Sequence, residues 1–148
     1  MMIARASVLV SAPIQFVREA VLDPTAYSYG DTKVQDMVVE SRGEDQLVAR
    51  INGRLGPFKS FIRARYQLAD NRVELTMLQG RLRDFHAVFL FEQEEDGVRL
   101  THQEEYDFGY PLVTPLLERL LQRWATRSVQ AEVNSLKHAA EARVPAPA

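Results

Sequence analysis

The hydrophobic and polar positions along the chain predict a strand, a short helix, a run of strands and one long helix. Residues 3–10 are rich in β-branched and aliphatic side chains, which favours a strand. Pro13 then stands at the first turn of a helix, whose apolar positions within 14–21 recur at helical spacing until the Asp-Pro pair at 23–24 ends it. Residues 25–31 predict a turn or a single helical turn.

Six further strands follow, joined by short turns. They are predicted over residues 33–41, 46–55, 58–69, 72–80, 83–94 and 98–108. The connections carry residues typical of hairpin turns, including Gly56-Pro57 and Asp96-Gly97. Because strands joined only by tight turns are antiparallel, the fold class is α+β, with a curved antiparallel sheet of about seven strands.

One long amphipathic helix is predicted over residues 111–141, and the preceding elements are expected to provide the surface on which it lies. Four apolar residues recur along it at spacings of three and four, so they share one stripe that needs an apolar partner. They are Val113, Leu117, Leu120 and Trp124. Prolines at 111 and 115 place the start of the helix, since proline is tolerated in or before a first turn.

A second apolar row occupies the later part of the same helix. Val129, Val133 and Leu136 are rotated well away from the first stripe. A helix with two apolar faces contacts two partners. We therefore expect this row to be a candidate contact surface, for another protein or for a second copy in a homodimer.

Strand alternation identifies polar residues that face inward. In strand 83–94 the odd positions are the more apolar, and pairing across the Asp96-Gly97 turn places them on the same face as His102, Glu104 and Tyr106. An unpaired buried polar group costs about 1–3 kcal/mol. These side chains therefore lie near water or bond one another, or they line a pocket whose polar groups orient a ligand. The faces of strands 33–41 and 46–55 stay ambiguous, because a one-residue bulge would exchange them.

Composition narrows the class of protein. The chain has 148 residues without a linker-like stretch, so we expect one domain over residues 1–142 and a disordered tail over 143–148. The formal net charge is −2 and the basic residues are scattered, which predicts no nucleic-acid partner. No apolar run is long enough to span a membrane and no signal-peptide layout is present, so a cytoplasmic protein is expected.

The sequence predicts neither a metal site nor a cofactor. Cysteine is absent, which excludes thiolate ligands and disulfides. His86, His102 and His138 fall on an outward strand face, an inward strand face and the late helix, so the histidines do not form a cluster with metal-ligand spacing.

The order of elements resembles the START-like, or SRPBCC, superfamily, whose helix-grip fold is shared with Bet v 1-type and polyketide cyclase/dehydrase-like proteins. Four segments carry the resemblance: residues 8–13 (VLVSAP), 22–24 (LDP), 97–102 (GVRLTH) and 134–137 (NSLK). The resemblance implies a curved sheet gripping the terminal helix around a deep apolar cavity. Members bind lipids, quinones or polyketides, and some act as cyclases, dehydratases or chaperone activators, so the fold alone does not choose a function.

Our leading hypothesis is binding, for transport or sequestration, of a hydrophobic or amphipathic small molecule such as a lipid, quinone or polyketide, in a cavity between the sheet and the C-terminal helix. The expected apolar wall is Ile62, Met77, Phe89, Leu117 and Leu120, and the expected polar or aromatic anchors are Tyr66, His102, Glu104, Tyr106 and Trp124. One alternative is a polyketide cyclase or dehydratase in which His102 or Glu104 moves a proton. Another is a chaperone-activator-like interaction domain with a filled core.

Overall fold

The elements follow the order that the sequence predicts. The structure is a computed structural model that describes residues 1–29, 33–55, 58–111 and 114–145. Its elements are β1 (Met2–Val10), α1 (Ile14–Val21), the 3-10 helix η1 (Pro24–Tyr27), β2 (Val34–Arg42), β3 (Gln46–Leu55), β4 (Phe58–Ala69), β5 (Arg72–Gly80), β6 (Asp84–Glu94), β7 (Gly97–Asp107) and α2 (Pro115–Ala142). The predicted Gly56-Pro57 turn and Val113 lie outside the described residues.

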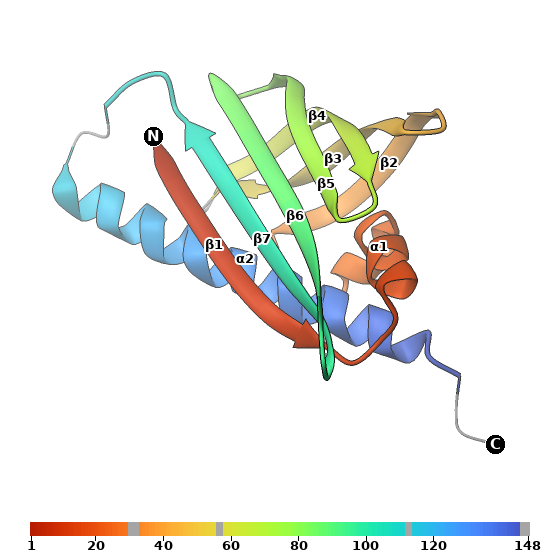
Figure 1. Cartoon of the computed structure of the whole chain (residues 1–148). Coiled ribbons are helices and arrows are strands. Elements are labelled where there is room, and N and C mark those ends of the chain that lie inside the picture. The colour runs from red at the N-terminus through yellow and green to blue at the C-terminus, as the bar shows by residue number, and fades with distance from the viewer. Residues whose placement is uncertain (30–32, 56–57, 112–113, 146–148) are drawn as a thin grey trace.

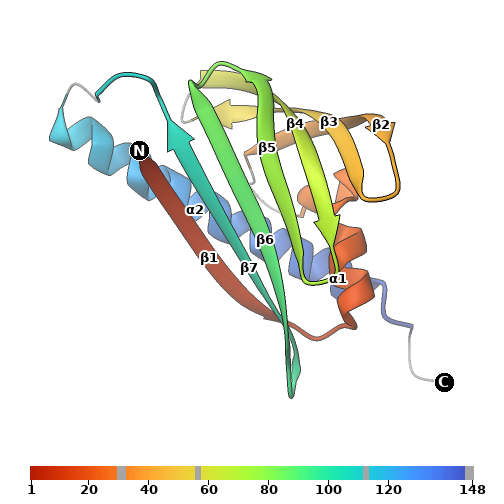
Figure 2. The same ribbon diagram turned by 45° about the horizontal axis from the view of Figure 1, so that its top comes forward.

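The strands form one curved antiparallel sheet with the order β1-β7-β6-β5-β4-β3-β2. Each strand from β2 to β7 pairs with its sequence neighbour, and β1 joins the far edge beside β7. Helix α2 crosses one side of this sheet, as Figures 1 and 2 show, and it contacts β1, β7, α1 and η1. The predicted helix-grip architecture is confirmed.

The face assignment of the β6–β7 hairpin is also confirmed. Phe85 pairs with Tyr106 and Phe89 pairs with His102 across the hairpin, and the side chains of all four are buried. Because alternate residues of a strand share a face, Glu104 lies between His102 and Tyr106 on the same inward face.

Bulges in β2 determine which residues of β2 and β3 face the core, the point that the sequence left ambiguous. The β2–β3 register shifts twice, between Val34 and Asp36 and between Val39 and Ser41. With these shifts Met37 faces the core, while Asp36 is exposed and its Oδ1 accepts a hydrogen bond of 2.7 Å from Nδ2 of Asn52.

Helix α2 begins at Pro115, four residues after the predicted start at Pro111, and a different face from the expected one lies on the sheet. Pro115 is in the first turn, and the hydroxyl of the capping residue Thr114 accepts a hydrogen bond of 3.1 Å from the backbone N–H of Leu117. Leu117 and Leu120, from the stripe expected to pack on the sheet, are exposed because the first turns of α2 extend past the end of β1 (Figure 1). For these two leucines that expectation was wrong, whereas Trp124 of the same stripe is partly buried against the core.

The later half of α2 packs on the sheet through the second apolar row. Val129, Val133 and Leu136 are fully buried, so they do not form the outer contact surface that the sequence suggested. Small residues accompany them at Ala125 and Ser128. Short side chains let the helix backbone approach the strands closely, which explains why this half rather than the leucine-rich half makes the core.

The end of α2 is tied to the first helical segment. Arg143 forms ion pairs with Asp23, which precedes η1, and with Glu19 on α1, the latter at 3.5 Å. The tail that the sequence predicts from residue 143 therefore begins with a side chain that has partners, and residues 146–148 lie outside the described part of the chain.

Candidate ligand-binding site

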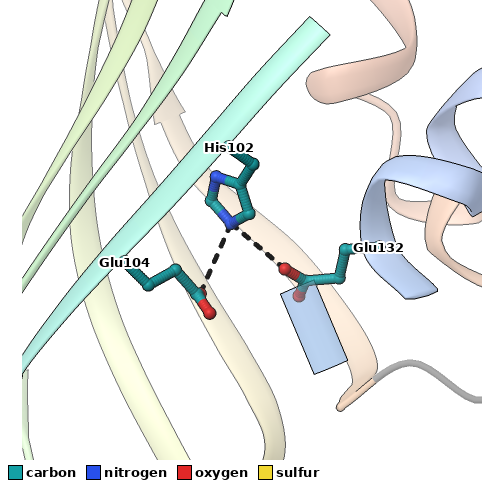
Figure 3. A group of neighbouring side chains, drawn as sticks. All are labelled: His102, Glu104 and Glu132. Atoms are coloured by element: carbon teal, nitrogen blue, oxygen red, sulfur yellow. Dashed lines mark ion pairs between the residues drawn. The ribbon is translucent and has the colours of Figure 1, made fainter. Parts of the chain in front are cut away.

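Four charged side chains meet in the interior between β7, α2 and the segment before β2. Nζ of Lys33 lies 2.6 Å from Oε1 of Glu104 and 2.9 Å from Oε1 of Glu132. Nε2 of His102 lies 3.4 Å from Oε2 of Glu104 and 3.1 Å from Oε2 of Glu132 (Figure 3). Each carboxylate therefore contacts Lys33 with one oxygen and His102 with the other. We call these four residues the charged cluster.

The position of each member follows from its element. His102 and Glu104 alternate along β7, and Glu132 is one helical turn from the buried Ser128 and Leu136 on the sheet-facing side of α2. Lys33 is held beside Gly53 of β3, because the backbone N–H of Arg54 donates a 2.9 Å hydrogen bond to the Lys33 carbonyl oxygen. A Cβ atom at Gly53 would overlap that oxygen, so glycine permits this approach.

The imidazole of His102 is oriented by its other contacts. Nδ1 lies 3.1 Å from the carbonyl oxygen of Val88, which can only accept, so Nδ1 carries a proton. The ring stacks on Phe89 with centroids 3.9 Å apart. Burial by itself lowers the pKa of His102, but the carboxylates of Glu104 and Glu132 outweigh that effect and raise it to about 9. The ring is therefore an imidazolium at neutral pH.

Opposite charges balance within the cluster. Burial tends to raise the pKa of Glu104, but Lys33 and His102 dominate and hold it well below its usual range. Burial also opposes the charge of Lys33, and the two carboxylates nevertheless raise its pKa. Two cations thus face two carboxylates. Oε2 of Glu132 has no aligned hydrogen-bond donor among the described residues, so its 3.1 Å contact with His102 is electrostatic.

Three of the four side chains in the charged cluster could also hold a cation. One ligand atom from each of His102, Glu104 and Glu132 lies within 4.8 Å of the others. Cysteine is absent and the histidines are dispersed along the sequence, but one histidine with two carboxylates is also a possible ligand set, and only the fold brings these three together. In the present arrangement the Lys33 ammonium and the His102 imidazolium already neutralise both carboxylates.

An apolar pocket of about 50 Å³ lies next to the charged cluster. Strand residues and the β5–β6 turn line it: Val34, Ile51, Gly53, Arg54, Ser60, Phe61, Ile62, Leu82 and Phe85, with Lys33 and Tyr106 as its contacts with the cluster. The Tyr106 hydroxyl donates a 2.6 Å hydrogen bond to Oε1 of Glu104. The sequence placed the cavity between sheet and helix, but no residue of α2 lines this pocket, and the charged cluster occupies part of that space.

Five of the predicted site residues lie in or beside the pocket and the charged cluster. Ile62 and Tyr106 line the pocket. His102 and Glu104 belong to the charged cluster, and Phe89 supports it by stacking.

The other predicted residues lie elsewhere. Tyr66 is in the core, where its hydroxyl faces Sδ of Met37 at 3.9 Å, and Met77 and Trp124 are partly buried against the core. Leu117 and Leu120 are on the exposed part of α2.

Two residues of the cluster were missed. Lys33 has the pattern of a polar residue at the start of a strand, and only the fold brings it to Glu104. Glu132 did leave a signal, because it stands four residues after Ser128 and four before Leu136, on the row that proves to face the sheet. A charged residue on a sheet-facing row predicts a buried partner, but that row had to be recognised first.

Residues 1–141 match the family described as "Polyketide cyclase / dehydrase and lipid transport". The chain belongs to this family. The predicted resemblance to START-like proteins is thereby confirmed, and known structures of the START and Bet v 1 type agree. A search of curated protein sequences gives no significant match.

Similar solved structures share the fold at low sequence identity. TTHA0849 from Thermus thermophilus is 20% identical with a TM-score of 0.83, covering 95% of this chain and 97% of that one. The Zhui aromatase/cyclase from Streptomyces sp. R1128 is 18% identical with a TM-score of 0.75, covering 97% and 96%. A STAR-related lipid transfer protein from Xanthomonas axonopodis is 12% identical with a TM-score of 0.69, covering 92% and 84%.

Within the described ranges of this START-like chain, no helix combines the length and apolarity needed to cross a bilayer.

Proposed function

We propose that this START-like protein binds a small amphipathic molecule, such as a lipid, quinone or polyketide, in the strand-lined pocket. The observation that carries the proposal is the junction of apolar and charged groups: Phe85 and Ile62 offer an apolar wall, while Lys33 and Tyr106 bring donors to its edge. An apolar cavity with a few convergent polar groups is the usual make-up of a small-molecule site. The ligand would place an oxygen-bearing end near Lys33.

Ligand binding requires this pocket to widen. Ligand cavities usually measure about 300–1,000 Å³, whereas the pocket described here measures about 50 Å³. Ile62 is only partly buried, so its side chain can turn outward without leaving a close-packed core. The proposal therefore includes movement of pocket-lining side chains when the ligand enters, in a protein that we place in the cytoplasm.

The proposal is tested on protein purified from cells by native mass spectrometry and organic extraction, followed by thermal-shift assays with lipids, quinones and aromatic polyketides. We expect a stoichiometric apolar molecule or a concentration-dependent stabilisation. Ile62→Trp should abolish it by filling the pocket. Leu68→Trp is the matched control, because Leu68 is partly buried on the same strand and face but does not line the pocket. Equal loss in both variants, or no ligand in either assay, would contradict the proposal.

A proton-transfer activity is a second candidate, and the Tyr106 contact favours it. Tyr106 lines the pocket and its hydroxyl donates to the buried carboxylate of Glu104, so this side chain would connect a bound substrate to the cluster. Since burial raises the pKa of Tyr106 well above its usual range, its hydroxyl stays protonated, and a proton would pass through it only as a relay between the substrate and Glu104. In a Glu104→Gln variant, retained affinity with lost turnover would indicate catalysis, whereas retained affinity with no turnover in the parent protein would indicate binding alone.

A further inference from the structure

An exposed apolar surface occupies the part of α2 that extends beyond the sheet. Leu116 is 64% exposed, Leu120 52% and Leu117 41%. Large apolar side chains exposed together on one segment mark a contact surface more often than isolated ones do. Neither the pocket nor the charged cluster includes any of these leucines.

Basic residues flank these leucines. Arg119, Arg123 and Arg127 are four residues apart, so they form one exposed row along the helix, and Leu120 lies beside them. Leu120, Arg123 and Arg127 also line a shallow surface depression. None of the three arginines forms an ion pair with a residue that the structure describes. We call the three leucines and three arginines the overhang patch.

The overhang patch changes the electrostatic interpretation of the sequence. The whole chain carries a formal charge of −2, and its basic residues are scattered along the sequence. The fold nevertheless gathers around the exposed leucines three arginines that form no ion pair with a described residue, with Glu118 as the only acidic residue of the first helical turn. The surface therefore combines an apolar centre with local positive charge.

We propose that the overhang patch docks this protein on an anionic lipid surface. A helix segment with leucines beside arginines is suited to lie in the plane of a membrane interface, where the leucines enter the acyl boundary and the arginines meet anionic headgroups. The segment projects beyond the sheet (Figure 1), so its first turns can reach a flat surface without displacing another element.

Charge favours a lipid surface over a second copy of the chain. A two-fold contact places the same surface against itself, so it would bring Arg119, Arg123 and Arg127 towards their own counterparts. Repulsion between these like charges opposes that contact, whereas an anionic surface attracts all three. The proposal does not depend on the identity of the pocket ligand, because the overhang patch and the pocket share no residue.

The test is flotation of the full chain with vesicles of phosphatidylcholine alone or with about 30% phosphatidylglycerol. We expect binding to the anionic vesicles only, weakened when salt rises from about 0.05 to 0.5 M. Leu116→Ser/Leu120→Ser should lower the partition coefficient about tenfold or more. Val38→Ser/Leu78→Ser is the matched control, because both residues are similarly exposed apolar side chains on the strands, and it should bind like the parent.

A second pair of variants tests the charges. Arg119→Ala/Arg123→Ala should weaken binding by about fivefold for each arginine, while Arg42→Ala/Arg65→Ala, exposed on β2 and β4, should have no more than a small effect. The proposal is overturned if anionic vesicles do not bind the protein at low salt, or if the control pairs weaken binding as much as the patch pairs.

The oligomeric state of the same variants shows whether a second copy of the chain, rather than a lipid surface, occupies the patch. Light scattering that shows a dimer lost in Leu116→Ser/Leu120→Ser would assign the patch to a second copy and overturn lipid docking. Vesicle binding by a protein that stays monomeric would support it. Circular dichroism checks that each variant folds, which we expect because all the substituted residues are exposed.

Discussion

His102 on β7 and Glu132 on α2 contact each other across the interface between sheet and helix, with Nε2 and Oε2 3.1 Å apart. The contact joins the last strand to the terminal helix in the middle of the interior. Lys33 completes it from the segment before β2 by binding both Glu104 and Glu132. One electrically neutral group of charges therefore holds together three segments that are distant in the sequence. Substitutions in this cluster should consequently change the stability of the whole protein.

Glu132→Gln should destabilise the protein by about 3–5 kcal/mol, because it leaves Lys33 and His102 buried with a single carboxylate. The free energy of unfolding in urea measures the effect. Glu118→Gln is the control, since Glu118 is exposed on the same helix, and it should change the stability by less than about 0.5 kcal/mol. Equal effects of the two substitutions would mean that the cluster carries no net ion-pair energy.

Stability should fall as the pH rises from about 6.5 towards 9. The folded pKa of His102, about 9, is above its usual value of 6.5, so its contribution is fully present below 6.5 and is lost as the pH passes the folded pKa. The shift corresponds to about 3 kcal/mol. Urea titrations across this range measure it. His102→Gln should remove most of the slope, whereas His86→Gln, on a partly exposed residue, should retain it.

Gly53→Ala should disrupt the charged cluster and lower the thermal stability of the protein, although it adds only a methyl group. The new Cβ would overlap the Lys33 carbonyl oxygen, so the Lys33 segment must move away from Glu104 and Glu132. Thermal unfolding measures the loss. Gly43→Ala is the control, because its Cβ would lie 3.7 Å from the nearest atom, an ordinary contact. A stability that is equal to that of the control would show that Lys33 adapts without cost.

The two apolar rows of α2 should respond in opposite ways to truncation. Leu136→Ala should cost about 2–5 kcal/mol, since Leu136 is fully buried. Leu117→Ala should change the free energy of unfolding by less than about 0.5 kcal/mol, because Leu117 is exposed on the overhang. A large cost at Leu117 would mean that this part of α2 packs against the protein in solution.

Local patterns determined the elements of this protein and their order. Alternation along β6 and β7 was enough to place His102, Glu104 and Tyr106 inward, because a side chain in a paired strand has only two faces available. Helical spacing likewise found both apolar rows of α2. The order of these elements, with the segments quoted above, carried the resemblance to the helix-grip family, although the pairing of β1 with β7 joins residues that are far apart in the sequence.

Tertiary structure decided which row of α2 meets the sheet and which residues complete the site. Periodicity gives the angle around the helix axis between Leu120 and Val133, but not how far the sheet extends along the helix. The sequence therefore predicted that the Leu120 row packs on the sheet and that the Val133 row is exposed, and the structure shows the reverse. Lys33 and Glu132 are 99 residues apart in the chain, and no local pattern connects them. Their meeting depends on strand curvature and helix position together, because a buried charge is stable only where the complete fold brings its partner.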